Sequence, residues 1–192
     1  MSASSYGIIV EGTYDSAAYD AIIGKLSPGI PIKTIACGGK SDLMKKFPGL
    51  LKAFEFEIAE RPIDMAVVIL DADGKKPEEV EEQMAAKIDV RDYPFALGVQ
   101  FFVVPQALES WLLADVKALD AVSQRRSGRR VTRSCDSPEA LLRPKEWLRQ
   151  LLTDHKLDYT SGLAREIAQE IDLNTLSDRR PRFRAFTELV DC

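Results

Sequence analysis

The chain has 192 residues, of which 45% are apolar and 29% charged, and it carries a formal net charge of -4 at pH 7. This composition is typical of a globular chain with one domain, or with one domain and a helical extension. No apolar run approaches the ~20 residues of a membrane-spanning helix, and the widely spaced cysteines indicate neither a disulfide framework nor a zinc site, so we expect a cytoplasmic protein without membrane contact.

Four apolar runs predict strands, and a helical pattern follows each of them. The runs cover residues 6–10, 32–37, 66–70 and 99–104. Helical patterns cover residues 15–26, a stretch from about 41 with an interruption at Pro48-Gly49, residues 77–88, and a single helix over residues 106–119. Alternating strands and helices predict a four-stranded, mainly parallel, doubly wound α/β sheet of the Rossmann-like kind.

The remaining sequence reads as helical. We therefore predict an α/β domain over residues 1–122, and over residues 123–192 a basic link with a helical extension packed on that domain. The link covers residues 123–134, and the expected helices cover residues 138–152, 163–171 and 182–190.

Acidic side chains follow two of the predicted strands. Glu11 ends the first strand, while Asp71 and Asp73 follow the third. In a parallel sheet the carboxyl ends of the strands share one edge, so we expect the three carboxylates to converge there. Close carboxylates repel one another unless a cation lies between them, and Mg²⁺ prefers oxygen ligands. The alternative is that all three are polar turn residues, with Asp71 capping a helix.

Two further residues are expected at the same edge. Glu109 lies in the first turn of the helix after the fourth strand, where the alternative is an exposed residue favoured by the helix dipole. Lys40 in CGGKSD follows the second strand and could hold a phosphate or an attacking water. A Walker loop would require its first glycine at Thr34, so the alternative for Lys40 is a glycine-rich turn before a capped helix.

A run of arginines predicts a contact with nucleic acid despite the acidic total charge. It comprises Arg125, Arg126, Arg129, Arg130 and Arg133. Such a segment could follow a phosphate backbone, because each neutralised phosphate releases counterions. A solubilising flexible link is the alternative.

Taken together, these motifs resemble the TOPRIM domain of topoisomerases, bacterial-type primases and OLD-family nucleases. The resemblance lies in Glu11 of IIVEGTYD and in the DxD of VVILDADG. More narrowly, EGTYDSAAY, CGGKSDL, PQALESWLLAD and SDRRPRFRAF resemble the TOPRIM-like DUF4276 proteins, and this likeness spans most of the chain.

The resemblance implies a nuclease that depends on Mg²⁺ or Mn²⁺. Glu11, Asp71 and Asp73 would hold the metal, and Glu109 and Lys40 would be accessory catalytic residues. The expected partners are a nucleic acid, DNA in preference to RNA, and a separate ATPase chain of a defence or repair system, because the sequence has no NTP-binding motif. A homodimer remains open. The sequence departs from topoisomerases and primases, since it offers no assignable tyrosine nucleophile and no primase zinc module.

Other functions remain open at this stage. The chain could be a binding or regulatory subunit that keeps the metal pocket without cleaving. ILDADG also resembles the nucleophile loop of haloacid-dehalogenase-type phosphatases, although that motif usually lies on the first strand. A restriction-type site built from Asp64 and Asp73-Gly74-Lys75 is a further alternative, which requires two strands to supply closely spaced residues.

Overall fold

Four parallel strands form one sheet in the computed structural model, which describes residues 3–56, 62–135 and 137–190. They are β1 (Tyr6–Val10), β2 (Ile32–Ala36), β3 (Met65–Asp71) and β4 (Val99–Val104). Their order across the sheet is β2-β1-β3-β4, and all three neighbouring pairs are parallel. The predicted parallel α/β class is therefore confirmed.

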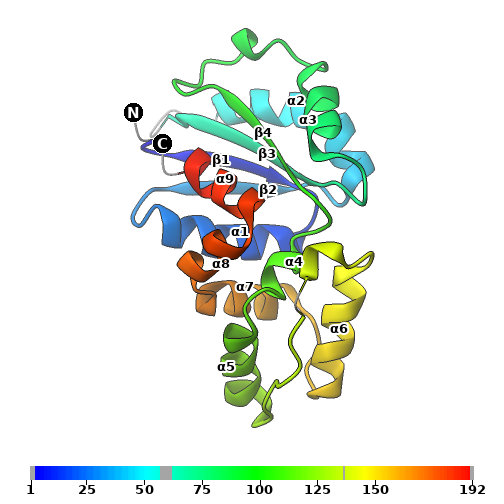
Figure 1. The fold of residues 1–192 in the computed structure, drawn as a ribbon. Coiled ribbons are helices and arrows are strands. Elements are labelled where there is room, and N and C mark those ends of the chain that lie inside the picture. The colour runs from blue at the N-terminus through cyan, green and yellow to red at the C-terminus, as the bar shows by residue number, and fades with distance from the viewer. Residues whose placement is uncertain (1–2, 57–61, 136, 191–192) are drawn as a thin grey trace.

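Helices cover both faces of the sheet (Figure 1). Helices α1 (Thr13–Leu26) and α9 (Pro181–Val190) lie on one face, and α2 (Lys40–Phe56) and α3 (Pro77–Ala85) on the other. Alternate residues of β3 join opposite cores: Val67 and Ile69 pack with the first pair of helices, Val68 and Leu70 with the second. Burial on both faces explains why this strand is an unbroken apolar run.

The chain after β4 is helical, and Figure 1 shows α5 and α6 away from the sheet. Before α9 it contains α4 (Glu109–Leu112), α5 (Val116–Ser127), α6 (Pro144–Asp154), α7 (Ser161–Glu170) and α8 (Leu173–Arg179), with a short 3-10 turn at Pro138–Ala140. Another 3-10 turn, Val90–Asp92, precedes β4. Trp111 is fully buried and meets Phe183 of α9 edge to face, with ring centroids 4.8 Å apart. Within the described ranges, no helix is long and apolar enough to cross a membrane. The predicted domain boundary at residue 122 falls inside α5 and stays a prediction.

The helix predicted over residues 106–119 is wrong in one respect, because it is broken in two. Asp115 stands between α4 and α5, and its side chain accepts hydrogen bonds from the backbone N–H groups of Lys117 and Ala118. This N-cap makes Asp115 a helix start rather than a helix interior. At its other end α5 runs to Ser127, beyond the predicted start of the basic link, and Gly128 ends it with a φ of 69°.

Helix α2 is continuous through Pro48, contrary to the interruption that the sequence predicted. A proline inside a helix leaves the carbonyl four residues earlier without its usual donor. Here that carbonyl belongs to Met44, and the Lys87 ammonium group donates to it at 3.1 Å. The side chain of Lys87, just after the end of α3, therefore replaces the missing backbone donor.

The outer edge of β4 is covered by two side chains. The Val103 N–H donates to the Glu81 carboxylate at 2.9 Å, and Arg182 Nε donates to the Val103 carbonyl at 3.0 Å. Arg182 also forms an ion pair with Glu81, and its guanidinium lies 4.4 Å from the centre of the Phe102 ring. An ion pair between α3 and α9 thus occupies the backbone N–H and carbonyl groups of Val103, near the carboxyl end of this strand.

Candidate functional site

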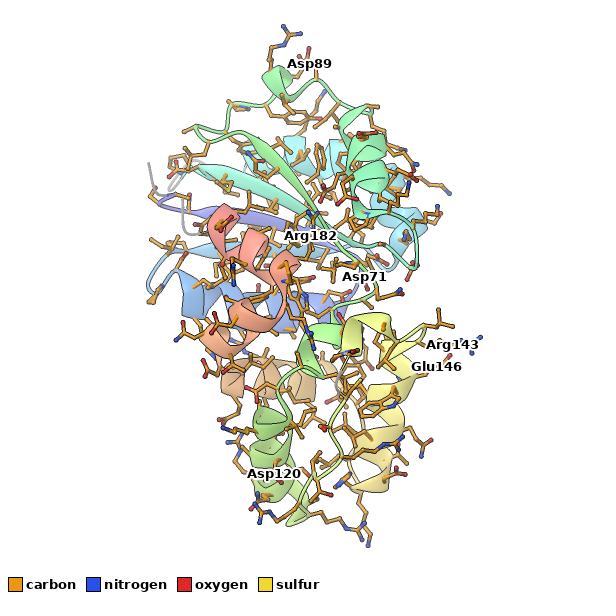
Figure 2. All side chains as sticks on the ribbon, viewed as in Figure 1. Asp71, Asp89, Asp120, Arg143, Glu146 and Arg182 are labelled. Carbon is orange, nitrogen blue, oxygen red and sulfur yellow. The ribbon has the colours of Figure 1, made fainter. Side chains whose placement is uncertain are left out.

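The ends of β1 and β3 bring Glu11 and Asp71 together, although they are 60 positions apart in the chain. The Asp71 N–H donates to Glu11 Oε1 at 2.9 Å. In turn, Asp71 Oδ1 accepts a hydrogen bond from the Leu108 N–H at 3.2 Å, just before α4. Both acidic side chains are partly buried. Figure 2 shows Asp71 where the sheet meets the lower helices.

A glycine turn positions Lys40 beside them. After β2, the N–H groups of Gly38 and Gly39 both donate to the Glu11 carbonyl at 2.8 Å, with φ angles of 88° and 134° that favour glycine. Lys40 follows as the first residue of α2, and its ammonium group donates to the Asp71 carbonyl and to Asp73 Oδ2, the latter at 2.8 Å. The CGGKS turn therefore attaches a cation to the end of β3.

Asp73 lies at the same edge in a different environment. Its side chain is 62% exposed and paired with Lys40. Its φ of 50° is in the left-handed region, which aspartate tolerates better than most residues, and Gly74 continues the turn at 81°. This turn leaves Asp73 at the mouth of the site, whereas Glu11 and Asp71 lie deeper.

Two more carboxylates complete the acidic cluster. Glu109 is only 1% exposed, so the alternative of an exposed helix residue is wrong; the Tyr159 hydroxyl donates to it at 3.1 Å. Asp15, in the first turn of α1, accepts the Gly12 N–H at 2.8 Å. Asp15 was not among the predicted site residues, although an acidic residue in the first turn of the helix that follows Glu11 was a usable signal.

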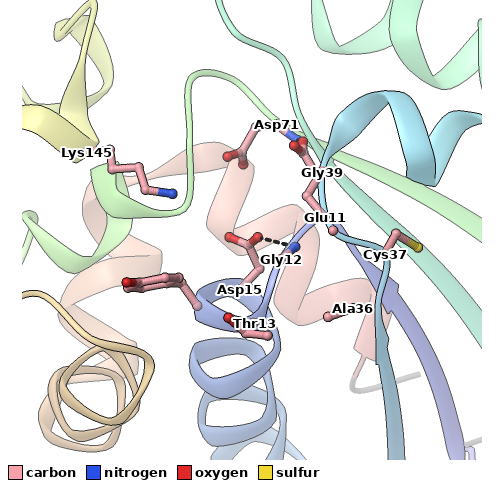
Figure 3. A pocket seen from close by; sticks show the side chains of 11 residues that line it. Glu11, Gly12, Thr13, Asp15, Ala36, Cys37, Gly39, Asp71 and Lys145 are labelled. Atoms are coloured by element: carbon pink, nitrogen blue, oxygen red, sulfur yellow. Dashed lines mark hydrogen bonds between the residues drawn. The ribbon is translucent and has the colours of Figure 1, made fainter.

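Lys145 enters the cluster from α6. Its ammonium group lies 3.7 Å from Glu109 Oε1 and 5.2 Å from the centre of the Tyr14 ring. Tyr14 in turn packs against Tyr159, with ring centroids 5.0 Å apart. In Figure 3 the Lys145 side chain is directed toward the space between Asp15 and Asp71. No local pattern marked this lysine, because only tertiary packing brings α6 to the sheet edge.

The carboxylates perturb one another. Burial raises the pKa of Asp71 well above its ordinary value, and Asp15, Glu11, Glu109 and Asp73 all raise it further. Burial followed by the charge of Glu109 raises the pKa of Asp15 to about 6. Burial also raises the pKa of Glu11, against the opposing effects of the Asp71 N–H and of Lys40. The acidic side chains of the cluster thus outnumber its two lysines, Lys40 and Lys145, and their ionisation is opposed by burial and by one another.

Two cavities open onto these residues. One of about 490 Å³ is lined by Glu11, Asp15, Asp71 and Lys145 among others (Figure 3). Another of about 350 Å³ joins Glu11, Asp71, Asp73 and Glu109 to the start of α6. Both are large enough for a small ligand or for one residue of a polymer.

The donor chemistry of this cluster suits a hard divalent cation, because carboxylate oxygens are the ligands that Mg²⁺ and Mn²⁺ prefer. The placement of these side chains around a single ion is less complete. Among the residues that the structure describes, no group of three or more Asp, Glu, His or Cys side chains is placed to hold one metal ion. Asp73 is engaged by Lys40, and Glu11 by the Asp71 N–H. Metal binding by Glu11, Asp71 and Asp73 stays a prediction.

The predicted nucleic-acid-binding arginines all have partners within the helical part of the chain. Arg125 and Arg126 form ion pairs with Glu166 and Glu170 of α7. The others contact the Asp154 carbonyl (Arg129, 3.0 Å), the Asp120 carboxylate (Arg130, 3.5 Å) and the Trp147 ring (Arg133, 5.1 Å). These contacts hold α5 and the link against α6 and α7. A role in nucleic-acid binding stays a prediction.

The restriction-type alternative fails on position. Asp64 precedes β3, and its carboxylate accepts the Ser4 N–H at 2.7 Å, whereas Asp73 follows β3. Seven strand residues at about 3.3 Å each separate the two carboxylates by roughly 20 Å. The two carboxylates therefore lie at opposite ends of β3 and cannot bind the same metal ion.

Comparisons with known proteins complete this description. Residues 10–191 match the family model described as Domain of unknown function (DUF4276). No curated protein matches the chain. Among solved structures, the C-terminal region of the Xanthomonas campestris pv. campestris OLD protein aligns over 96% of both chains, with 16% sequence identity and a TM-score of 0.43. That similarity is too low to support an inference about activity.

Proposed function

This chain belongs to the DUF4276 family, and we propose that it is a metal-dependent enzyme of TOPRIM type that cleaves phosphodiester bonds in nucleic acids. One observation carries the proposal: Glu11, Asp15, Asp71 and Glu109 gather from separate elements at the carboxyl edge of a parallel sheet, where open α/β folds bind ligands. Raised pKa values at such an edge are more typical of functional sites than of purely structural ones.

The deeper carboxylates would hold the ion. Glu11 and Asp71 are the first candidates, with Asp15 and Glu109 next to them and Asp73 at the mouth. A bound Mg²⁺ or Mn²⁺ would stabilise charge on the transferred phosphoryl group and lower the pKa of a bound water. Burial and mutual repulsion raise the pKa of Asp71, and a divalent cation between the carboxylates would relieve that repulsion and favour their ionised forms.

The two lysines favour a phosphate substrate. Carboxylates alone would repel a phosphodiester, but Lys40 and Lys145 approach the cluster from two elements, α2 and α6. An ammonium group beside the reacting phosphate can neutralise charge that develops in the transition state. Lys40 would act at the mouth, next to Asp73, and Lys145 beside Glu109.

The remaining parts of the proposal concern partners. DNA is proposed as the substrate in preference to RNA. A separate ATPase chain of a defence or repair system is proposed as the partner, because this sequence has no NTP-binding motif. Co-purification with a separately expressed candidate ATPase would test the second point. A homodimer remains open and would be measured by light scattering.

The experiment is nicking of supercoiled plasmid by the purified protein in Mn²⁺, compared with Asp71→Asn. Asp89→Asn is the matched control, since Asp89 is exposed and lies at the far end of the molecule from Asp71 (Figure 2). We expect nicking by the wild type and the control, and at least 100-fold slower nicking by Asp71→Asn. Tight Mn²⁺ binding without any nicking, with or without the ATPase, would favour a non-cleaving binding subunit. Turnover of an aryl phosphate instead would favour a phosphatase.

A further inference from the structure

A third cavity, of about 370 Å³, lies between α2 and α3 on the other side of Lys40. Its floor is apolar and consists of Leu70, Val80 and part of Met44. Leu70 and Val80 are 1% and 2% exposed, so the floor belongs to the packed core and is fixed in place. Leu70 directly precedes Asp71. The two side chains point to opposite faces of β3, so the cavity and the acidic cluster flank the end of this strand.

The rim of this cavity is polar and carries two lysines. Lys40 and Lys75 stand on it together with Ser41 and Gln83. Lys40 is shared with the acidic site, because its ammonium group holds Asp73. The exposed Lys75 ammonium group has no hydrogen bond or ion pair with any described residue. Lys40 on the rim thus faces the acidic cluster, and Lys75 is available to a ligand in the cavity.

We propose that this cavity is a nucleoside subsite, which takes the base and sugar next to the phosphodiester that the acidic cluster cleaves. An apolar floor with a few polar groups on its rim suits the face of a base and the sugar beside it. Lys75 would contact the phosphate of the bound nucleotide. This inference rests on the proposed function and adds the substrate class of an adjoining site.

Size and charge favour this occupant over a protein segment. The volume lies near the lower end of the range for small-ligand pockets, which suits one nucleotide and not an extended helix. The positive rim complements phosphate. Lys40 lines this cavity and also pairs with Asp73 of the acidic site. A ligand in the cavity would therefore continue past Lys40 toward the acidic cluster.

The test uses thymidine 5′-monophosphate and thymidine as probes, with binding measured by saturation-transfer NMR on the base protons in the absence of metal. Ser41→Trp places an indole ring into the cavity from an exposed position of α2. Lys45→Trp is the matched control, because Lys45 is exposed on the same helix and does not line the cavity. We expect Ser41→Trp to weaken nucleotide binding at least tenfold and Lys45→Trp less than twofold.

Lys75→Ala provides a second variant that leaves the cavity open. It should weaken the monophosphate about threefold to tenfold and leave thymidine unchanged, because it removes only the phosphate contact. Circular dichroism would check that every variant is folded. Equal saturation transfer in the wild type and Ser41→Trp would overturn the subsite. So would the same loss of binding in Lys45→Trp.

The two proposals can fail separately. Plasmid nicking by the wild type in Mn²⁺, together with unchanged nucleotide binding by Ser41→Trp, would overturn only the subsite. Nucleotide binding that Ser41→Trp abolishes, together with no nicking under any condition, would overturn only the nuclease.

Discussion

Lys145 Nζ lies 3.7 Å from the Glu109 carboxylate, which is almost fully buried between the sheet edge and α6. The two residues come from different parts of the chain: Glu109 follows the last strand, while Lys145 begins the helix that closes the site. Lys145 also packs on Tyr14, whose neighbour Tyr159 donates to the same Glu109. Through this contact the C-terminal helices contribute directly to the acidic site.

We expect Lys145→Met to slow plasmid nicking by tenfold or more. Methionine keeps much of the apolar stem that packs on Tyr14 and removes the charge beside Glu109, so the loss would reflect weaker neutralisation of the phosphate. Lys117→Met is the control, because Lys117 is exposed on α5 and lines no cavity of the site. A Lys145→Met enzyme as fast as the control would show that the ammonium group only shields Glu109.

Glu11→Gln should weaken Mn²⁺ binding at least tenfold, measured by isothermal titration calorimetry. Glutamine can still accept the Asp71 N–H through its side-chain oxygen, so the variant removes charge and keeps the local hydrogen bond. Because repulsion within the cluster falls, the metal-free protein should melt at the same temperature or higher. Glu82→Gln on the exposed side of α3 is the control. Undiminished Mn²⁺ affinity in Glu11→Gln would remove this residue from the proposed ligands.

Asp15 should make the stability of the metal-free protein depend on pH. Its pKa is raised from 3.8 to about 6, so its protonated form is favoured in the folded state; its contribution is fully present below pH 4 and is lost as pH rises through 6. Asp15→Asn should therefore increase the free energy of unfolding at pH 7.5 by about 1–3 kcal/mol and change it little at pH 4. Urea denaturation at both pH values measures this.

The exposed Asp158→Asn variant serves as the control for that series. An equal gain in stability from Asp158→Asn would point to the reduced net charge rather than to Asp15. Binding of Mn²⁺ should show the complementary behaviour. Because the ion requires ionised carboxylates, its affinity should rise between pH 5 and 7 and each binding event should release protons.

Two pairs of arginines distinguish the surfaces that could contact a nucleic-acid backbone. Arg143 and Arg149 line the cavity beside the acidic cluster, and Arg143 is exposed at the start of α6 (Figure 2). Replacing both with alanine should reduce the salt slope of DNA binding by about 2, if each contacts one phosphate. Arg143 pairs with its exposed neighbour Glu146 within one helix turn, whereas Arg125 and Arg126 pair with Glu166 and Glu170 and so join α5 to α7. The double alanine variant of Arg125 and Arg126 should therefore change the slope less. A larger change there would support the sequence prediction for that segment.

Much of the fold could be predicted from residue periodicity. The strands β1 and β4 occupy the predicted residues, and β2 and β3 differ at their ends by one residue. Buried parallel strands give long β-branched runs, which few other structures produce. Where a helix is interrupted and where it continues was harder to predict. A cap at Asp115 and a lysine that replaces the donor lost at Pro48 both depend on neighbours that local patterns do not reveal.

The residues of the candidate site likewise fall into those that the sequence could predict and those that it could not. Glu11, Asp71 and Lys40 could be assigned to one edge because parallel strands end together. The distances among these residues could not be predicted, because they depend on the order of the strands, which places β1 beside β3. Burial of Glu109 and the approach of Lys145 depend on how the C-terminal helices pack, so no spacing rule could reveal them.

The side chains of Glu81 and Arg182 that engage Val103 have a consequence for self-association. An open sheet edge is a template onto which a strand from another copy can add, and such addition begins aggregation. Here the backbone donor and acceptor of Val103, near the end of β4, are already engaged by a carboxylate and a guanidinium. Growth of the sheet from this side would first have to break a partly buried ion pair, so the fold protects its own last strand from polymerisation.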